Sequence, residues 1–233
     1  PTMPQTWMIT GANRGIGLAL TMELLRRGDH VVAAARDPWG GALAEVAGGQ
    51  AGTLTPLELD VTSDKSVAAA KQALDGRPID VLVNNAGVYG PRDRQSALDM
   101  DFNAWREVFE VNVYAPLRVA QAFLPNVEAG TGRKIVTISS RMGSIGSNPS
   151  GAIAYRSSKA AVNMVMVGFG NAVRGSEVAV LLFHPGWVRT DMGGGGADIP
   201  PAESAAGLIA TIDASGMRET NSFRNWKGDE IPW

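Results

Sequence analysis

Short apolar runs alternate along the chain with longer segments of helical character. The apolar runs are bounded by glycine, asparagine or aspartate, a pattern typical of strands that are buried on both faces. They predict strands near 6–10, 31–35, 54–59, 80–84, 133–139 and 178–184, and a seventh around 222–226. Helices are predicted between them at 14–27, 64–75, 101–124, 154–174 and 202–212. This alternation predicts an α/β fold, a doubly wound parallel sheet with helices on both faces.

The organisation of the chain points to one domain. Its 233 residues can form one sizeable core and are too few for two comfortable ones. Glycine and proline punctuate the connections at 37–41, 90–92, 130–132 and 193–196, without an internal repeat or a linker. We therefore expect a single domain over 1–233.

Composition and charge exclude several classes of function. A formal net charge of −2 offers no field for nucleic acid or for an anionic membrane. The absence of cysteine excludes thiol catalysis and thiolate metal sites, and two histidines cannot form an imidazole metal cluster. No apolar run reaches the ~18 residues of a membrane span, and the first residues show no leader pattern. We expect a soluble, cytoplasmic protein without a bound metal.

A glycine-rich turn follows the first strand. In 11–17, Gly11 would allow a tight turn, Gly15 the close approach of phosphates, and Gly17 the packing of helix on strand. Helix-terminal N–H groups there would face a pyrophosphate, beside Asn13, Arg14 and Ile16. Because three residues separate the first two glycines, the match to the standard fingerprint is imperfect. Three glycines in an ordinary βα turn remain the alternative.

Tyr155 and Lys159 stand four residues apart in a predicted helix. Residues at i and i+4 share a helix face, so the ammonium would lie one turn from the phenol. A phenol loses its proton only near pH ~10, and the cation would make that proton easier to donate. By itself Tyr-x-x-x-Lys is a weak signal, but together with the glycine-rich turn upstream the pair suggests hydride chemistry.

An ordered series of motifs follows the predicted strands. In order they are Asp60-Val61, Asn84 to Gly87, Asn112, Ser139-Ser140, Tyr155 with Lys159, and Pro185-Gly186. From about Thr6 to Thr190 the series resembles the short-chain dehydrogenase/reductase family. Within that family, the segments 154–159, 184–192 and 228–233 are similar to the branch that contains the C-factor proteins and sniffer-type carbonyl reductases.

The resemblance implies catalytic roles. Tyr155 would donate the proton, Ser140 would hydrogen-bond the substrate oxygen, and Lys159 would lower the tyrosine pKa and bind the nicotinamide ribose. Asn112 resembles the helix-bending asparagine of the family, whose carbonyl would anchor a water that leads to Lys159. A polar residue at a local kink is the alternative for Asn112.

Charge at the end of the second strand predicts the cofactor. The family resemblance implies that an acid which reads a free 2′-hydroxyl would stand at position 35. Ala35 stands there and Arg36 follows it, so a 2′-phosphate and hence NADP(H) is favoured over NAD(H). Arg14 is a second candidate cation. Asp37 could repel the phosphate or reach a ribose hydroxyl, and solvated loop charges remain possible for Arg36 and Asp37. Asp60 is expected at the adenine edge with Val61 against the ring, although a simple strand-end aspartate would look the same.

The remaining predicted cofactor contacts lie in two loops: Asn85, Ala86, Gly87, Pro185, Gly186, Val188 and Thr190. The glycine-rich segment near 191–201 is where the family places its substrate lid, and its four consecutive glycines suggest that little holds it. The sequence predicts an NADPH-dependent carbonyl reductase with a small-molecule substrate. The alternatives are an NAD-linked alcohol dehydrogenase and a dinucleotide-binding signalling protein. Family members often pair through the helices that here hold Asn112 and Tyr155, which implies a homodimer or homotetramer.

Overall fold

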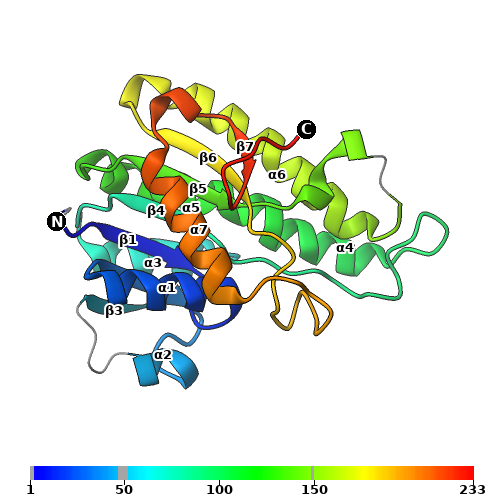
Figure 1. The fold of residues 1–233 in the computed structure, drawn as a ribbon, viewed down its shortest axis with the longest axis horizontal. Helices are drawn as coiled ribbons and strands as arrows, with labels where there is room; N and C mark the ends of the chain where they lie inside the picture. The colour runs from blue at the N-terminus through cyan, green and yellow to red at the C-terminus, as the bar shows by residue number, and fades with distance from the viewer. Residues whose placement is uncertain (1–2, 47–51, 148–149) are drawn as a thin grey trace.

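The computed structural model describes residues 3–46, 52–147 and 150–233. Its centre is a seven-stranded sheet in the order β3-β2-β1-β4-β5-β6-β7, and every pair of neighbouring strands is parallel (Figure 1). The strands are β1 (Thr6–Thr10), β2 (His30–Ala35), β3 (Thr53–Glu58), β4 (Val81–Asn84), β5 (Lys134–Ile138), β6 (Ala179–His184) and β7 (Phe223–Asn225). The doubly wound α/β fold expected from the sequence is confirmed.

Helices cover both faces of the sheet. They are α1 (Gly15–Arg27), α2 (Gly41–Val46), α3 (Asp64–Leu74), α4 (Phe102–Phe109), the π-helical turn η1 (Glu110–Tyr114), α5 (Ala115–Ala129), α6 (Ile153–Ala172) and α7 (Pro201–Ala214). Short 3₁₀ turns are η2 (Arg141–Gly143), η3 (Ile145–Ser147), η4 (Arg174–Ser176) and η5 (Met217–Glu219). Apolar side chains of α3, α5 and α6 pack on one face, and those of α1, α2 and α7 pack on the other. None of these helices is long and apolar enough to span a membrane.

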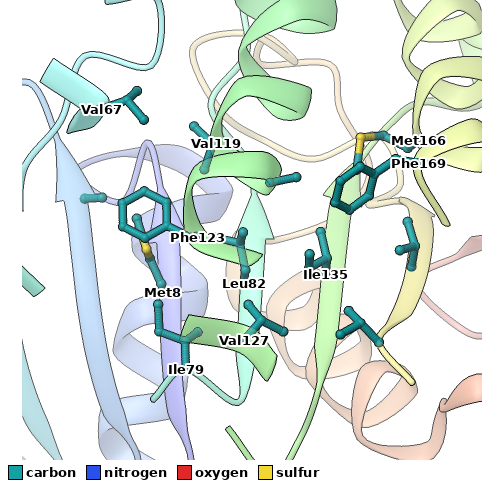
Figure 2. Close-up of a cluster of buried hydrophobic side chains, with 14 of the residues drawn as sticks. Met8, Val67, Ile79, Leu82, Val119, Phe123, Val127, Ile135, Met166 and Phe169 are labelled. Carbon is teal, nitrogen blue, oxygen red and sulfur yellow. The ribbon is translucent and has the colours of Figure 1, made fainter. Parts of the chain in front are cut away.

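The face under α5 shows how the apolar pattern becomes a core. Figure 2 shows Phe123 and Val127 of α5 over Met8 and Leu82, from neighbouring strands β1 and β4. All four side chains are fully buried. Because the opposite face carries a second buried cluster, the central strands are apolar at successive positions, as parallel strands between two helical layers require.

The region predicted as one helix over 101–124 differs in two ways. It contains the π-helical turn η1, and α5 continues past Pro125 to Ala129. The proline ring is exposed while Asn126 and Val127 are buried beyond it, and Asn126 Nδ2 donates to the carbonyl of Arg77 at 2.9 Å. These tertiary contacts outweigh the backbone hydrogen bond that the proline cannot donate. The short helix α2 was not predicted, because Gly40 and Gly41 indicate a loop.

The strand order reverses direction at β1, which lies between β2 and β4. In a parallel sheet the loops on the two sides of such a point leave in opposite directions and open a crevice at the carboxyl ends of the strands. The loops that follow β1, β4, β5 and β6 therefore converge there.

Candidate active site

A cleft of about 1490 Å³ lies at the carboxyl ends of the strands. Nearly all the residues predicted for catalysis or cofactor binding line it: Gly11, Asn13, Arg14, Gly15, Ile16, Arg36, Asp60, Val61, Asn85, Ala86, Gly87, Ser140, Tyr155, Lys159, Pro185, Gly186, Val188 and Thr190. Gly17 and Asn112 are not among the lining residues. Both lie behind the lining residues and contact the segments that carry them.

The turn after β1 needs its glycines. Gly11 has a φ of +65°, and a Cβ there would lie 3.0 Å from Cα of Ala86. A Cβ on Gly17 would collide with the carbonyl oxygen of Gly11, so Gly17 supports the turn from below. Within the described residues, α1 begins without a side-chain cap and without an acid in its first turn. Its free N–H groups and positive dipole end are therefore available to an anion.

Asn85 ties this turn to the end of β4. Its Nδ2 donates to the carbonyls of Thr10 at 2.9 Å and Gly11 at 3.2 Å. The Thr10 hydroxyl accepts the backbone N–H groups of Asn85 at 3.0 Å and Ala86 at 3.1 Å. We call this group of four bonds the Thr10–Asn85 clasp. The Asn85 side chain, in the loop after β4, thus holds the glycine turn that follows β1 in place.

Arg36 and Asp60 stand at the β2–β3 end of the cleft. Hydrogen bonds from the hydroxyl and the N–H of Thr62 lower the pKa of Asp60, and the nearby charge of Arg36 acts in the same direction. Asp37 turns away: its Oδ1 accepts the N–H of Gly40 at 3.0 Å, and it does not line the cleft. Its carboxylate closes its own turn.

Tyr155 and Lys159 lie one turn apart on α6 and are both buried. Lys159 Nζ lies 5.7 Å from the centroid of the tyrosine ring and donates to the carbonyl of Ile138 at 3.0 Å. Burial raises the pKa of Tyr155 to about 12, against the lowering effect of a hydrogen bond with Ser140. Burial also lowers the pKa of Lys159 to about 8. At neutral pH the phenol therefore keeps its proton and the amine remains mostly charged.

Asn112 lies inside the π-helical turn, near Lys159. Its Oδ1 accepts the N–H of Val88 at 2.9 Å, and its Nδ2 donates to the Val88 carbonyl at 2.8 Å and the Ser158 hydroxyl at 3.0 Å. A Cβ built on Gly87 would lie 3.3 Å from Asn112 Oδ1 and 3.7 Å from Lys159 Nζ. The structure thus brings Asn112 beside Lys159 and places an irregular helical turn at the asparagine.

The sequence did not single out Tyr89 and Arg92, which complete the catalytic end. The ring of Tyr89 stacks on that of Tyr155, with centroids 4.7 Å apart and planes at 29°. The guanidinium carbon of Arg92 lies 5.0 Å from the centroid of Tyr89, and its Nη2 donates to the carbonyl of Met192 at 2.7 Å. No spacing marks these residues; their position shortly after the Asn84 to Gly87 motif is the available signal.

The glycine-rich segment after β6 is more constrained than the sequence suggested. The N–H of Gly193 donates to the Thr190 hydroxyl at 3.1 Å, and the N–H of Gly194 donates to the Thr190 carbonyl at 2.8 Å. A Cβ on Gly193 would collide with the carbonyl oxygen of Val188, and Gly194 has a φ of +78°. The expectation that little holds the four glycines is wrong for these two, because the fold of the segment itself requires them.

Comparisons with known proteins agree with this geometry. The family model described as short chain dehydrogenase matches residues 5–197. The C-signal protein of Myxococcus xanthus is 41% identical over 158 residues, 67% of this chain and 93% of the relative. The 1-hydroxy-2-glutathionyl-2-methyl-3-butene dehydrogenase of Rhodococcus sp. (strain AD45) is 36% identical over 98% of this chain and 99% of its own. An NADPH-bound carbonyl reductase from chicken fatty liver has a TM-score of 0.88 at 30% identity, over 100% of both chains.

Proposed function

Because this chain belongs to the short-chain dehydrogenase/reductase family of oxidoreductases, we propose that it reduces a ketone or aldehyde to the alcohol with NADPH, and catalyses the reverse reaction. The observation that carries the proposal is the meeting of Ser140, Tyr155 and Lys159 in the same cleft as the glycine turn. A protein that only bound a dinucleotide would not need all three side chains.

The cleft fits NADP(H) by its own chemistry. The uncapped N-terminus of α1 and the close-packed glycine turn would hold the pyrophosphate. Arg36 and Arg14 line the cleft where a 2′-phosphate would lie, and Ala35 offers no carboxylate to repel it. When bound, the nicotinamide supplies the hydride. The NADPH bound to the chicken carbonyl reductase supports the same assignment.

The side chains divide the remaining work. Tyr155, whose raised pKa keeps the phenol protonated, donates its proton to the carbonyl oxygen. Ser140 donates a hydrogen bond to the same oxygen as negative charge builds on it. Lys159 holds the nicotinamide ribose, and its charge favours release of the phenolic proton. Asn112 keeps the backbone around Val88 and Lys159 in position through its three hydrogen bonds.

A screen of ketones and aldehydes tests this function. Purified protein should oxidise NADPH with at least one carbonyl compound and should prefer NADPH to NADH. In the same assay Tyr155→Phe should bind NADPH normally, measured by fluorescence titration, and lose at least ~10²-fold in kcat, as expected for the loss of a general acid. Near-normal turnover by the variant would contradict the mechanism, and a preference for NADH would favour the NAD-linked alcohol dehydrogenase. Cofactor binding without turnover of any carbonyl would favour a signalling role such as that of a C-signal relative.

The proposal also covers assembly and location. Aromatic side chains form a stripe along α4 and η1, in which Phe102 and Tyr114 are exposed and Trp105 and Phe109 are half-buried. Trp105 Nε1 donates to the Ser157 hydroxyl on α6, so the stripe continues toward α6. We assign this face to a homodimer, or to the same contact within a homotetramer. A cytoplasmic location is part of the proposal, because NADPH is an intracellular reductant.

A further inference from the structure

The catalytic half of the cleft contains arginines without an acidic partner. Arg92, Arg141 and Arg156 line the cleft, and none of them forms an ion pair with any residue that the structure describes. Elsewhere five arginines do have acidic partners: Arg26, Arg27, Arg94, Arg118 and Arg133. These three guanidinium groups give this part of the cleft positive charge although the net charge of the chain is −2.

Arg156 gives the sharpest indication. Its Nε is buried and finds no hydrogen-bond partner among the described residues, while its Nη1 makes one long bond of 3.4 Å to the carbonyl of Met142. Buried N–H groups almost always have a partner. Because Arg156 lines the cleft and only its Nη1 has a partner among the described residues, the guanidinium has donors left for a ligand.

Arg141 stands at the same turn as Arg156. It directly follows Ser140, and Met142, the neighbour of Arg141, supplies the carbonyl that Arg156 contacts. The charge of Arg141 also reaches the end of β6, where burial and then this cation lower the pKa of His184 to about 4. His184 is therefore neutral at pH 7 and does not compete for an anion. Two guanidinium groups that have no acidic partner among the described residues thus lie at the turn that follows the proposed oxygen-binding serine.

The cofactor does not require these two cations. The anionic groups of NADP(H) would lie at the glycine turn and the ends of β2 and β3, beside Arg14 and Arg36, whereas Arg141 and Arg156 belong to the β5–α6 side. The acids that line the cleft belong to other elements than Arg141 and Arg156. Glu110 is paired with Arg118, Asp60 follows β3, Glu107 lies on α4, and Asp191 lies on the segment after β6. Relying on the proposed reductase function, we propose that the natural substrate is a carbonyl compound that also carries a carboxylate. Arg156 and Arg141 bind this carboxylate while Ser140 and Tyr155 hold the carbonyl oxygen.

The test compares 4-formylbenzoate with methyl 4-formylbenzoate, which have the same aldehyde and similar size but differ in charge. At saturating NADPH, kcat/KM should be at least about tenfold higher for the carboxylate, in the range of one charge-assisted hydrogen bond. Arg156→Gln and Arg141→Gln should each lower the carboxylate-to-ester ratio, and Arg156→Lys should retain part of it. Arg174→Gln, which removes an exposed arginine outside the cleft, is the control for charge alone.

Binding measured without turnover separates the two proposals. Calorimetric titration of the NADP⁺ complex with 4-(hydroxymethyl)benzoate and with its methyl ester should show tighter binding of the carboxylate, weakened by Arg156→Gln and by high salt. If the carboxylate binds in this arginine-dependent way but no ketone or aldehyde of the screen is reduced, the anion site stands and the reductase function fails. Equal binding of acid and ester, or equal losses for both in Arg156→Gln, would overturn the anion site and assign Arg156 to holding the Met142 turn.

Discussion

Arg36 and Ala35 are the residues through which the cofactor can be changed. Arg36 contributes a charge at the β2–β3 end of the cleft, and Ala35 leaves room for an acid. We expect Ala35→Asp with Arg36→Ala to shift preference from NADPH toward NADH by at least about tenfold, because one charge-assisted contact is lost and a ribose reader is gained. The change should fall mostly on KM for the cofactor.

The matched control is Asp37→Asn. Because the Asp37 carboxylate is bonded to Gly40 and does not line the cleft, this variant should keep the original cofactor ratio. Steady-state kinetics with both cofactors measure all variants. If the double mutant keeps its preference for NADPH, then Arg14, and not Arg36, contacts the 2′-phosphate.

Burial of the charged Lys159 side chain lowers the free energy of unfolding, and this cost depends on pH. Burial lowers its pKa from 10.5 to about 8, so between these values the unfolded chain holds more protons and the free energy of unfolding rises with pH. Below about pH 8 the cost of burying the charge is fully present. We expect Lys159→Met to raise the melting temperature of the cofactor-free protein at pH 7 and to lose activity.

Scanning calorimetry from pH 7 to 10.5 checks this sign. The advantage of the variant should shrink as the pH rises, whereas Lys71→Met, at an exposed position on α3, should show no such trend. A melting difference that stays constant across the range would mean that Lys159 titrates normally.

The residues proposed for catalysis could be picked out of the sequence because each belongs to a motif at a strand end or within one helical turn. Tyr89 was not, because no local pattern shows that the segment after β4 returns to stack a ring on Tyr155. Asp37 stayed ambiguous in the sequence for a similar reason. Whether its carboxylate faces the cleft depends on the turn that it forms with Gly40.

At the scale of elements, periodicity found the helices but not their irregularities. The π-helical turn adds one residue to a helical repeat around Asn112, and the apolar pattern on either side changes too little to show it. Pro125 is a strong stop signal in sequence, yet α5 passes it because the last turn packs on the core. Tertiary contacts decide both features, and local sequence does not contain them.

The segment after β6 offers a test of gating. Gly195 has no atom within 4 Å of a built Cβ and no positive φ, so alanine fits there and restricts the backbone. We expect Gly195→Ala to change KM for bulky carbonyls at least about twofold more than for small ones, while NADPH affinity stays the same.

Gly175→Ala, in a turn outside the cleft with equally open space, is the matched control. Gly194→Ala is unsuitable because its positive φ would add strain. Equal effects of Gly195→Ala on large and small substrates would show that this glycine does not gate the cleft.

At the scale of the whole molecule, the exposed side chains of α4, η1 and α6 mark the region where we expect a second copy. Phe102 is 63% exposed, Tyr114 53% and Met164 74%, which is unusual for apolar side chains gathered on adjacent helices. Met164→Arg should convert a dimer into a monomer at micromolar concentration, as seen by light scattering with chromatography. Met22→Arg, on α1 of the opposite layer, should not. A wild-type protein that is already monomeric would contradict the assignment of this face.

The fold as a whole was the most predictable level, because seven short apolar runs with helices between them allow few other arrangements. Strands that are buried on both faces are continuous apolar runs, so each can be recognised in the sequence before its neighbours in the sheet are known. Strand order is different: the placement of β1 between β2 and β4 rests on pairings between distant segments, which no local pattern encodes.

The Thr10–Asn85 clasp joins positions 75 residues apart in the chain. Asn85 and Ala86 lie outside any strand, so their amide hydrogens would ordinarily be expected to exchange with solvent quickly. Because the Thr10 hydroxyl of β1 accepts both, their release requires the loop after β4 to move away from β1. In deuterated water these two amides should therefore exchange as slowly as those of the central strands, and the Gly195 amide should exchange within the dead time. The floor of the cleft would then be the last part of the molecule to open.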